Sequence, residues 1–224
     1  MTDQLFDISA DPGRPEGVVD GAPGAMLVII SGPSGVGKDT IIDALQRRAA
    51  EDGRDGDRYY VVTCTTRAPR NGEVDGVNYH FMTRDEFLEK RAARGFLEAN
   101  EVHGNWYGSP RDPVRDALVA GRDVILKIDV QGAQQVKERV EEALLVFIVP
   151  PSMEALFERL RARDTETADE LEIRQRNAAI ELARQDDYDY VVTNETDQIE
   201  RTAARIDEII EAEHARHPMR RVRL

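Results

Sequence analysis

Residues 32–40 read Gly32-Pro33-Ser34-Gly35-Val36-Gly37-Lys38-Asp39-Thr40. They follow the continuous apolar run of residues 26–31, and after them Ile41, Ile42, Leu45 and Ala49 recur at helical spacing. Continuous apolar character is typical of a strand that is buried on both faces of a parallel sheet. The segment therefore predicts a strand, a glycine-rich turn and a helix in succession.

This turn matches the phosphate-binding loop pattern GxxxxGK[ST] except at its last position. Glycine lets the backbone bend so that successive N–H groups converge on phosphate oxygens, and the following helix N-terminus adds positive partial charge. Lys38 supplies a full positive charge for the terminal phosphates. We therefore expect residues 32–40, called the phosphate loop below, to bind phosphate groups.

Asp39 stands where the pattern has the serine or threonine whose hydroxyl binds Mg²⁺. A carboxylate is a hard oxygen donor, so Asp39 can hold the ion directly or through water. Thr40 follows, but one residue along a helix corresponds to a rotation of about 100°. The sequence leaves Asp39 and Thr40 as alternative metal-binding residues.

The overall charge limits the partners. The chain of 224 residues carries 30 Lys+Arg against 43 Asp+Glu, a formal net charge of −13. An acidic surface argues against nucleic acid or an anionic membrane as a partner, because like charges repel. No apolar run reaches the roughly 18 residues that span a bilayer, and no signal peptide is evident. A single cysteine, Cys64, fits a reducing compartment, so we expect a cytoplasmic protein; the sequence does not indicate an oligomeric state.

The chain divides by pattern. Residues 1–24 are acidic and rich in proline and glycine, which predicts a flexible tail outside the fold. Beyond them strands and helices alternate, as is typical of an α/β fold with a mostly parallel sheet. Residues 59–109 interrupt the alternation and are interpreted as an inserted β-rich subdomain, beginning with a strand over 59–65. Within it, Thr83 and Glu86 carry the signature of a capping box that starts a helix.

A second candidate anion site follows in Thr65-Thr66-Arg67-Ala68-Pro69-Arg70. Two arginines three positions apart, in a loop bent by proline, can both donate to one phosphate. Taken alone, such a pair more often consists of two solvated side chains. Its meaning depends on the segments that accompany it.

Six segments in order resemble the guanylate kinase family: GPSGVGK, TTRAPRNGEVDGVNYHF, FLEANEVHGNWYGS, IDVQGAQQV, RLRARDTE and DYDYVVTN. Members of this family move the γ-phosphoryl group of ATP to GMP, with Mg²⁺, and have a P-loop core, a GMP-binding subdomain and a mobile lid. The resemblance implies a kinase domain over residues 25–217. It implies a core of residues 25–58 and 110–217, a GMP-binding subdomain of residues 59–109 and a lid of residues 152–176.

The resemblance also implies roles in the GMP site. Arg67 and Arg70 would hold the GMP phosphate, and Tyr79 and Tyr107 would reach the same group. Glu98 would face guanine, whose N1–H and N2–H₂ donors lie along one edge where a carboxylate accepts both; adenine has no such pair. The other guanine-side positions correspond to Thr63, Ser109 and Asp129.

The lid arginines of the family correspond to Arg159, Arg163 and Arg174, which would close over the triphosphate and spread the charge of the transition state. Arg176 competes with Arg174, but the spacing to Glu181-Leu182 favours Arg174. Asn194, at the end of the last segment, belongs to the expected ATP site. With Lys38 and Arg67, the lid arginines are the expected catalytic residues; no side-chain nucleophile is needed, because the acceptor oxygen is already anionic.

Lys127 departs from the family, most of whose members carry an acidic residue just before the IDVQG segment. Asp39 is a departure of the opposite sign, and both residues lie near the expected phosphate site. We hypothesise that Asp39 and Lys127 form an ion pair in which each compensates the charge of the other.

Three other functions have to be distinguished from a guanylate kinase. A kinase for another nucleoside monophosphate, such as AMP, is disfavoured by Glu98 and the TTRAPR segment. A non-catalytic guanylate-kinase-like protein-binding module keeps the fold, but typically loses the phosphate loop and lid residues and carries PDZ and SH3 domains. A motor or AAA-type ATPase would need a longer chain and an acid pair that Asp129 alone does not provide.

Overall fold

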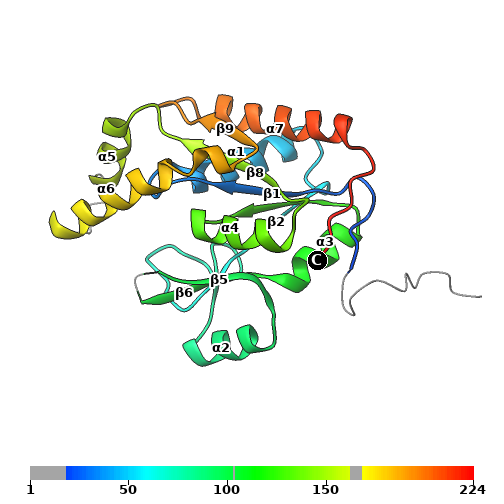
Figure 1. Cartoon of the computed structure of the whole chain (residues 1–224), viewed down its shortest axis with the longest axis horizontal. Helices are drawn as coiled ribbons and strands as arrows, with labels where there is room; N and C mark the ends of the chain where they lie inside the picture. Colours follow the sequence, from blue (N-terminus) through cyan, green and yellow to red (C-terminus); the bar gives the residue numbers. More distant parts are fainter. Residues whose placement is uncertain (1–18, 103, 162–167) are drawn as a thin grey trace, which may run out of the picture.

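A five-stranded parallel sheet forms the centre of the computed structural model, which describes residues 19–102, 104–161 and 168–224 (Figure 1). The strand order is β2-β7-β1-β8-β9, and each neighbouring pair runs parallel. The strands are β1 (Leu27–Ser31), β2 (Arg58–Tyr60), β7 (Asp123–Lys127), β8 (Leu144–Val149) and β9 (Tyr190–Thr193). All of β1 is buried, as its continuous apolar run predicts.

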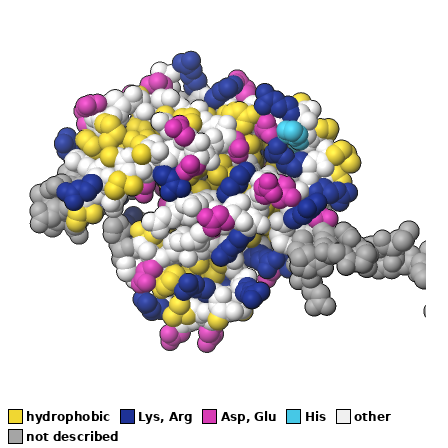
Figure 2. Space-filling view, in the orientation of Figure 1, with side chains coloured by type: hydrophobic (Ala, Val, Ile, Leu, Met, Phe, Trp, Pro, Cys, Tyr) yellow, Lys and Arg dark blue, Asp and Glu magenta, His cyan; other side chains and the backbone are white. Residues whose placement is uncertain are grey.

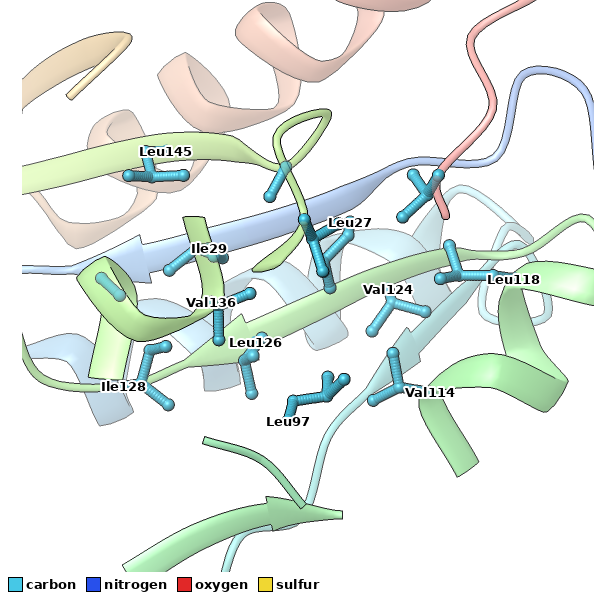
Figure 3. Close-up of a cluster of buried hydrophobic side chains, with 14 of the residues drawn as sticks. Leu27, Ile29, Leu97, Val114, Leu118, Val124, Leu126, Ile128, Val136 and Leu145 are labelled. Carbon is cyan, nitrogen blue, oxygen red and sulfur yellow. The ribbon is translucent and has the colours of Figure 1, made fainter. Parts of the chain in front are cut away.

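Helices cover both faces of this sheet. One face carries α1 (Lys38–Glu51) and α7 (Ile199–Arg216), and the other carries α3 (Arg111–Val119) and α4 (Val130–Arg139) (Figure 1). Two apolar cores result, one on each side of the sheet. Figure 3 shows the core under α3 and α4, where Val136 lies next to Leu126 of the sheet and Val114 lies next to Val124. The expected α/β class with a parallel sheet is confirmed.

A second, mixed sheet lies beside the first, with the strand order β4-β3-β6-β5. Leu97 of β5 reaches the core of the parallel sheet and so joins the two sheets (Figure 3). On the other side, Phe87 of α2 stacks on Phe96 with ring centroids 4.4 Å apart. The expected capping box of Thr83 and Glu86 starts α2. The elements of this part are β3 (Cys64–Thr65), β4 (His80–Phe81), α2 (Arg84–Ala92), β5 (Phe96–Val102) and β6 (Asn105–Pro110).

The strand expected over residues 59–65 divides between the two sheets. β2 pairs with β7 in the parallel sheet, whereas β3 pairs with β4 and β6 in the mixed sheet. Val61 still donates its N–H to Ile125 O of the first sheet, and Thr63 O already accepts from His80 N of the second. An apolar run indicates that a strand is buried but not which strand it pairs with. The pattern therefore does not show that residues 59–65 pass from the parallel sheet to the mixed sheet.

Residues 19–24, expected in the flexible tail of residues 1–24, belong to the fold. They pair with the C-terminal segment: Val19 N–H donates to Leu224 O at 2.9 Å, and Gly21 N–H donates to Val222 O at 2.8 Å. Val222 is fully buried in the core under α3. Residues 1–18 lie outside the described residues.

Two further helices lie at the end of the parallel sheet where the phosphate loop begins (Figure 1). They are α5 (Met153–Arg161) and α6 (Ala168–Leu182), followed by the short helix η1 (Gln185–Asp187). Leu156 and Leu160 of α5 pack against Ala178 of α6. Among the described helices, none is both long and apolar enough to cross a membrane.

Candidate nucleotide site

The phosphate loop takes a conformation that needs its glycines. Gly35 and Gly37 have φ values of 84° and 97°, in the left-handed region. A Cβ on Gly37 would lie 2.7 Å from Asn194 Nδ2, and one on Gly32 would lie 2.4 Å from Ile148 O. α1 starts directly after Gly37 without a side-chain cap. The first N–H groups of the helix are therefore left for a ligand, as at other anion-binding helix N-termini.

Lys38 folds back over this loop. Its Nζ donates to Gly32 O at 2.5 Å and to Pro33 O at 3.0 Å. Burial lowers the pKa of Lys38, and the negative charge of Glu181 is the strongest influence in the opposite direction. The ammonium group is thus held among backbone carbonyls at the place expected for the terminal phosphates.

Two side chains of α6 hold Ser34 of the loop. Arg174 Nη2 donates to Ser34 Oγ at 2.8 Å, and Ser34 N–H donates to Glu181 Oε2 at 3.2 Å. Burial raises the pKa of Glu181. This contact supports Arg174 over Arg176, which is exposed. Sequence reasoning gave Glu181 no role, although its seven-residue spacing from Arg174 puts both on one helix face.

Arg159 of α5 and Asn194 meet on the other side of the loop. Arg159 donates to Val36 O at 3.3 Å and to Asn194 O at 3.2 Å. Asn194, which is 5% exposed, donates from Nδ2 to Val36 O at 2.8 Å and accepts from the Thr202 hydroxyl at 3.1 Å. Both predicted residues therefore contact the loop, whereas Arg163 lies outside the described residues.

The hypothesised ion pair between Asp39 and Lys127 is present. Lys127 ends β7, and its register opposite Ile30 of β1 brings it next to the first turn of α1. Burial pulls the pKa of Lys127 down, but the contact with Asp39 outweighs it and the net effect raises that pKa. Asp39 and Thr40 are both exposed at the start of the helix.

Arg67 is the centre of the second anion site. Its Nη2 donates to Glu73 Oε1 at 2.8 Å and to Glu73 Oε2 at 3.0 Å. This pairing raises the pKa of Arg67 and lowers that of Glu73. The Arg67 guanidinium lies 5.4 Å from the Tyr79 ring centroid, and the Tyr79 and Tyr107 rings meet edge-on at 6.1 Å. Arg67, Tyr79 and Tyr107 are thus brought together, as the sequence predicts.

Arg70 is placed differently from Arg67. Its side chain is exposed, and its backbone N–H donates to Glu73 Oε2 at 2.7 Å. Glu73 therefore holds both ends of the segment from Arg67 to Arg70, a function that the sequence did not indicate. A carboxylate six residues after an arginine with a proline between them was the available signal, since a proline bend brings such a pair together.

Glu98 lies on β5 with 3% of its surface exposed. Its Oε1 accepts from Ser109 Oγ at 2.6 Å, and its Oε2 accepts from Asn100 Nδ2 at 3.1 Å. Burial raises the pKa of Glu98 to about 7. Asp129 lies nearby and caps α4 by accepting from Gly132 N–H at 2.7 Å. Thr63 is buried just before β3.

Lys127 connects the two sites. Its Nζ contacts Asp39, the residue after Lys38, and also lies 5.8 Å from the centroid of the Tyr79 ring. The phosphate loop and the Arg67 site therefore adjoin at this side chain. Figure 2 shows Lys and Arg interspersed with Asp and Glu over one face of the protein, so on that face the charges are mixed rather than gathered in a patch.

Comparison with known proteins agrees with this arrangement. The family model described as guanylate kinase matches residues 24–213. The chain is 44% identical over 191 residues to a guanylate kinase of Clostridium perfringens, covering 85% of each protein. It is 41% identical to guanylate kinase 2, chloroplastic/mitochondrial, of Oryza sativa, covering 90% of this chain and 69% of that one.

A solved structure supports the same assignment. The crystal structure of guanylate kinase from Anaplasma phagocytophilum matches with a TM-score of 0.64 at 35% identity, covering 84% of this chain and 86% of that one. On the family match and these relatives together, the chain belongs to the guanylate kinase family.

Proposed function

We propose that the phosphate loop holds ATP and that the Arg67–Tyr79–Glu98 site holds GMP. The chain is a guanylate kinase by its family and relatives, and these two sites serve its reaction, ATP and GMP giving ADP and GDP. The observation that carries this assignment is the double contact of Lys127, which adjoins both anion sites. Direct transfer requires the donor and acceptor phosphates to lie side by side and in line. Two separate binding sites would not meet this requirement.

Catalysis in this scheme rests on position and charge. A GMP phosphate oxygen attacks the γ-phosphorus of ATP, and the bond to the β–γ bridging oxygen breaks, leaving its electron pair on ADP. Lys38 neutralises charge on the transferring group, and Arg159 and Arg174 add to it from the lid helices. Arg163 is proposed for the same function. Arg67 exchanges the Glu73 carboxylate for the GMP phosphate, with Arg70, Tyr79 and Tyr107 beside it.

The start of α1 fits a magnesium ion. Asp39 offers an exposed carboxylate and Thr40 an exposed hydroxyl, both hard oxygen donors. Among the described residues there is no cluster of three or more metal-binding side chains. This suits an ion bound mainly by nucleotide phosphates and water, with one protein carboxylate. When bound, Mg²⁺ supplies positive charge to the β- and γ-phosphate oxygens.

Glu98 is the proposed guanine-recognition residue. As a carboxylate it accepts from guanine N1–H and N2–H₂, while Ser109 and Asn100 fix its two oxygens. Thr63 and Asp129 complete that side of the site. Adenine would leave a buried carboxylate without its donors, which costs about 1–3 kcal/mol or more.

Glu98 gives the reaction a pH dependence. Its pKa of about 7 means that below pH 7 most of the free protein carries a protonated carboxyl, which accepts poorly from guanine. We expect kcat/KM for GMP to rise with pH through about 7 and then level off. One unit below that pKa, kcat/KM should be about tenfold lower than on the plateau, because about a tenth of Glu98 is ionised.

The control for this profile is Glu98→Gln. GMP has its own phosphate ionisation near pH 6, which is common to both proteins. In Glu98→Gln, kcat/KM for GMP should therefore still change near pH 6 but no longer rise near pH 7. A limb near 7 that persists in Glu98→Gln would assign it to another group.

The substrate assignment is tested by coupled ADP release with ATP, Mg²⁺ and each of GMP, AMP, CMP and UMP. We expect turnover with GMP far above the other three. Faster turnover with AMP would assign the chain to a different nucleoside monophosphate. No turnover with any acceptor would favour the non-catalytic binding module.

We also infer the expected division of the chain into a core, a GMP-binding subdomain within residues 59–109 and a lid of residues 152–176, except that residues 59–61 pair with β7 and belong to the core. The separate mixed sheet and the packing of α5 on α6 support this division.

A cytoplasmic location is proposed as well. Cys64 is 1% exposed and burial raises the pKa of its thiol, which favours the unreactive protonated form.

A further inference from the structure

Lys127 marks the place where the two sites adjoin, but the catalytic scheme above gives it no chemical role. Its side chain is 23% exposed, whereas that of its partner Asp39 is 69% exposed. Lys127 therefore lies inward, at the end of β7 between β1 and the mixed sheet, and Asp39 contacts it from the solvent side. An exposed carboxylate is cheap to rehydrate, so this pair can separate at less cost than a fully buried pair.

Two cations lie close to the same aromatic ring. The Arg67 guanidinium is 5.4 Å and Lys127 Nζ is 5.8 Å from the centroid of the Tyr79 ring. Burial raises the pKa of Tyr79, so its hydroxyl is neutral and supplies no counter-charge. The ring attracts each cation only through its quadrupole. A phosphate bound between the two cations would satisfy both.

Each cation also has a carboxylate partner in this state. Glu73 pairs with Arg67, and Asp39 pairs with Lys127. Arg67 is the proposed ligand of the GMP phosphate. Because Lys127 is paired in the same way, we expect it to bind phosphate as well. Lys127 differs from Arg67 in one respect: its partner, Asp39, directly follows Lys38 of the phosphate loop.

We propose that Lys127 is a catalytic residue that contacts the phosphate oxygens at the point of transfer, and that Asp39 is its positioning residue. This inference rests on the proposed function. The acceptor oxygen forms its bond to the γ-phosphorus as the bond to the bridging oxygen breaks, and the electron pair remains on ADP. Lys127 keeps its proton throughout and acts by charge. Its value is greatest in the transition state, where both phosphates crowd together.

The test is steady-state kinetics of Lys127→Met and Lys127→Arg with saturating Mg²⁺. Lys127→Met should lower kcat by about 100-fold or more, as loss of one preorganised donor at a transition state lowers it by about 100- to 1000-fold. The equilibrium affinities for ATP and GMP, measured separately, should change less than kcat. Lys127→Arg keeps the charge and should recover most of the loss. Thermal unfolding of each variant checks that it is folded.

The matched control is Arg47→Met. Arg47 lies on α1, the helix of Asp39, and like Lys127 it pairs with a carboxylate, Glu200 of α7, but it takes no part in either anion site. Its kcat should stay within about twofold of wild type. The double-mutant cycle adds Asp39→Asn, which should lower kcat less than Lys127→Met does. With Mg²⁺ saturating, so that a weaker hold on the ion does not limit the rate, the double variant should resemble Lys127→Met, because Asp39 then acts through Lys127.

Three results would overturn the inference. One is a Lys127→Met protein with wild-type kcat. Another is a loss that Lys127→Arg does not recover and that follows the melting temperature, which would make the pair structural only. Additive effects of Asp39→Asn and Lys127→Met would contradict the positioning role. The proposed function fails separately, by absence of GMP turnover in the wild-type protein.

Discussion

Lys38→Ala should abolish turnover, lowering kcat by about 1000-fold or more, while GMP binds with nearly unchanged affinity. Lys38 Nζ lies over the phosphate loop, where it donates to Gly32 O and Pro33 O. An incoming phosphate takes the place of these carbonyls as its partner. The GMP-binding side chains come from other segments, so calorimetric titration with GMP should separate binding from chemistry.

Lys137→Ala is the control for Lys38→Ala. Lys137 likewise donates from Nζ to two backbone carbonyls, Glu141 O at 2.9 Å and Ala143 O at 2.8 Å, but at the end of α4. A cost that comes from losing such carbonyl contacts would appear in both variants as a lower melting temperature. Near wild-type kcat in Lys38→Ala, or parallel loss of GMP affinity, would contradict the assigned role.

Arg67→Ala should raise the KM for GMP and lower kcat, with a combined loss of about 100-fold in kcat/KM. Arg67 Nη2 now donates to both oxygens of Glu73. In place of Glu73, we expect the GMP phosphate to accept two hydrogen bonds from the fork of the guanidinium. The contact both binds and orients, so its loss should appear in both constants. The KM for ATP should change little.

Two variants make this test specific. Arg67→Lys keeps the charge but not the fork, and should recover only part of the loss. Arg84→Ala removes another arginine that pairs with a glutamate, Glu101, in the same part of the chain, and should leave GMP kinetics unchanged. Unchanged GMP kinetics in Arg67→Ala would remove Arg67 from the site.

The sequence predicted the features that depend on local pattern. The phosphate loop, the capping box of α2 and the position of Lys38 all follow from residues within a few places of one another. Glu98 was also placed in the site, although its pKa was not predicted, because that depends on burial by β6 and α4. The Asp39–Lys127 pair was predicted across a long separation, since two unusual charges of opposite sign were expected at one site.

The features that the sequence did not reveal depend on contacts between distant segments. Glu181 is far from Ser34 in the sequence, and only the folded position of α6 brings the two into contact. The division of residues 59–65 between two sheets depends on which strand lies alongside each half. Residues 19–24 are rich in glycine and proline, which predicts a tail, yet their backbone pairs with a C-terminal partner that no local pattern identifies.

That terminal pairing has a consequence for how the protein opens. Val19 and Leu224 exchange two backbone hydrogen bonds, and Gly21 and Gly24 donate to Val222 O and Arg220 O. Neither segment can detach without freeing the amides of the other. In hydrogen exchange, residues 19–24 and 220–224 should therefore lose protection together, as one cooperative unit formed by opposite ends of the chain.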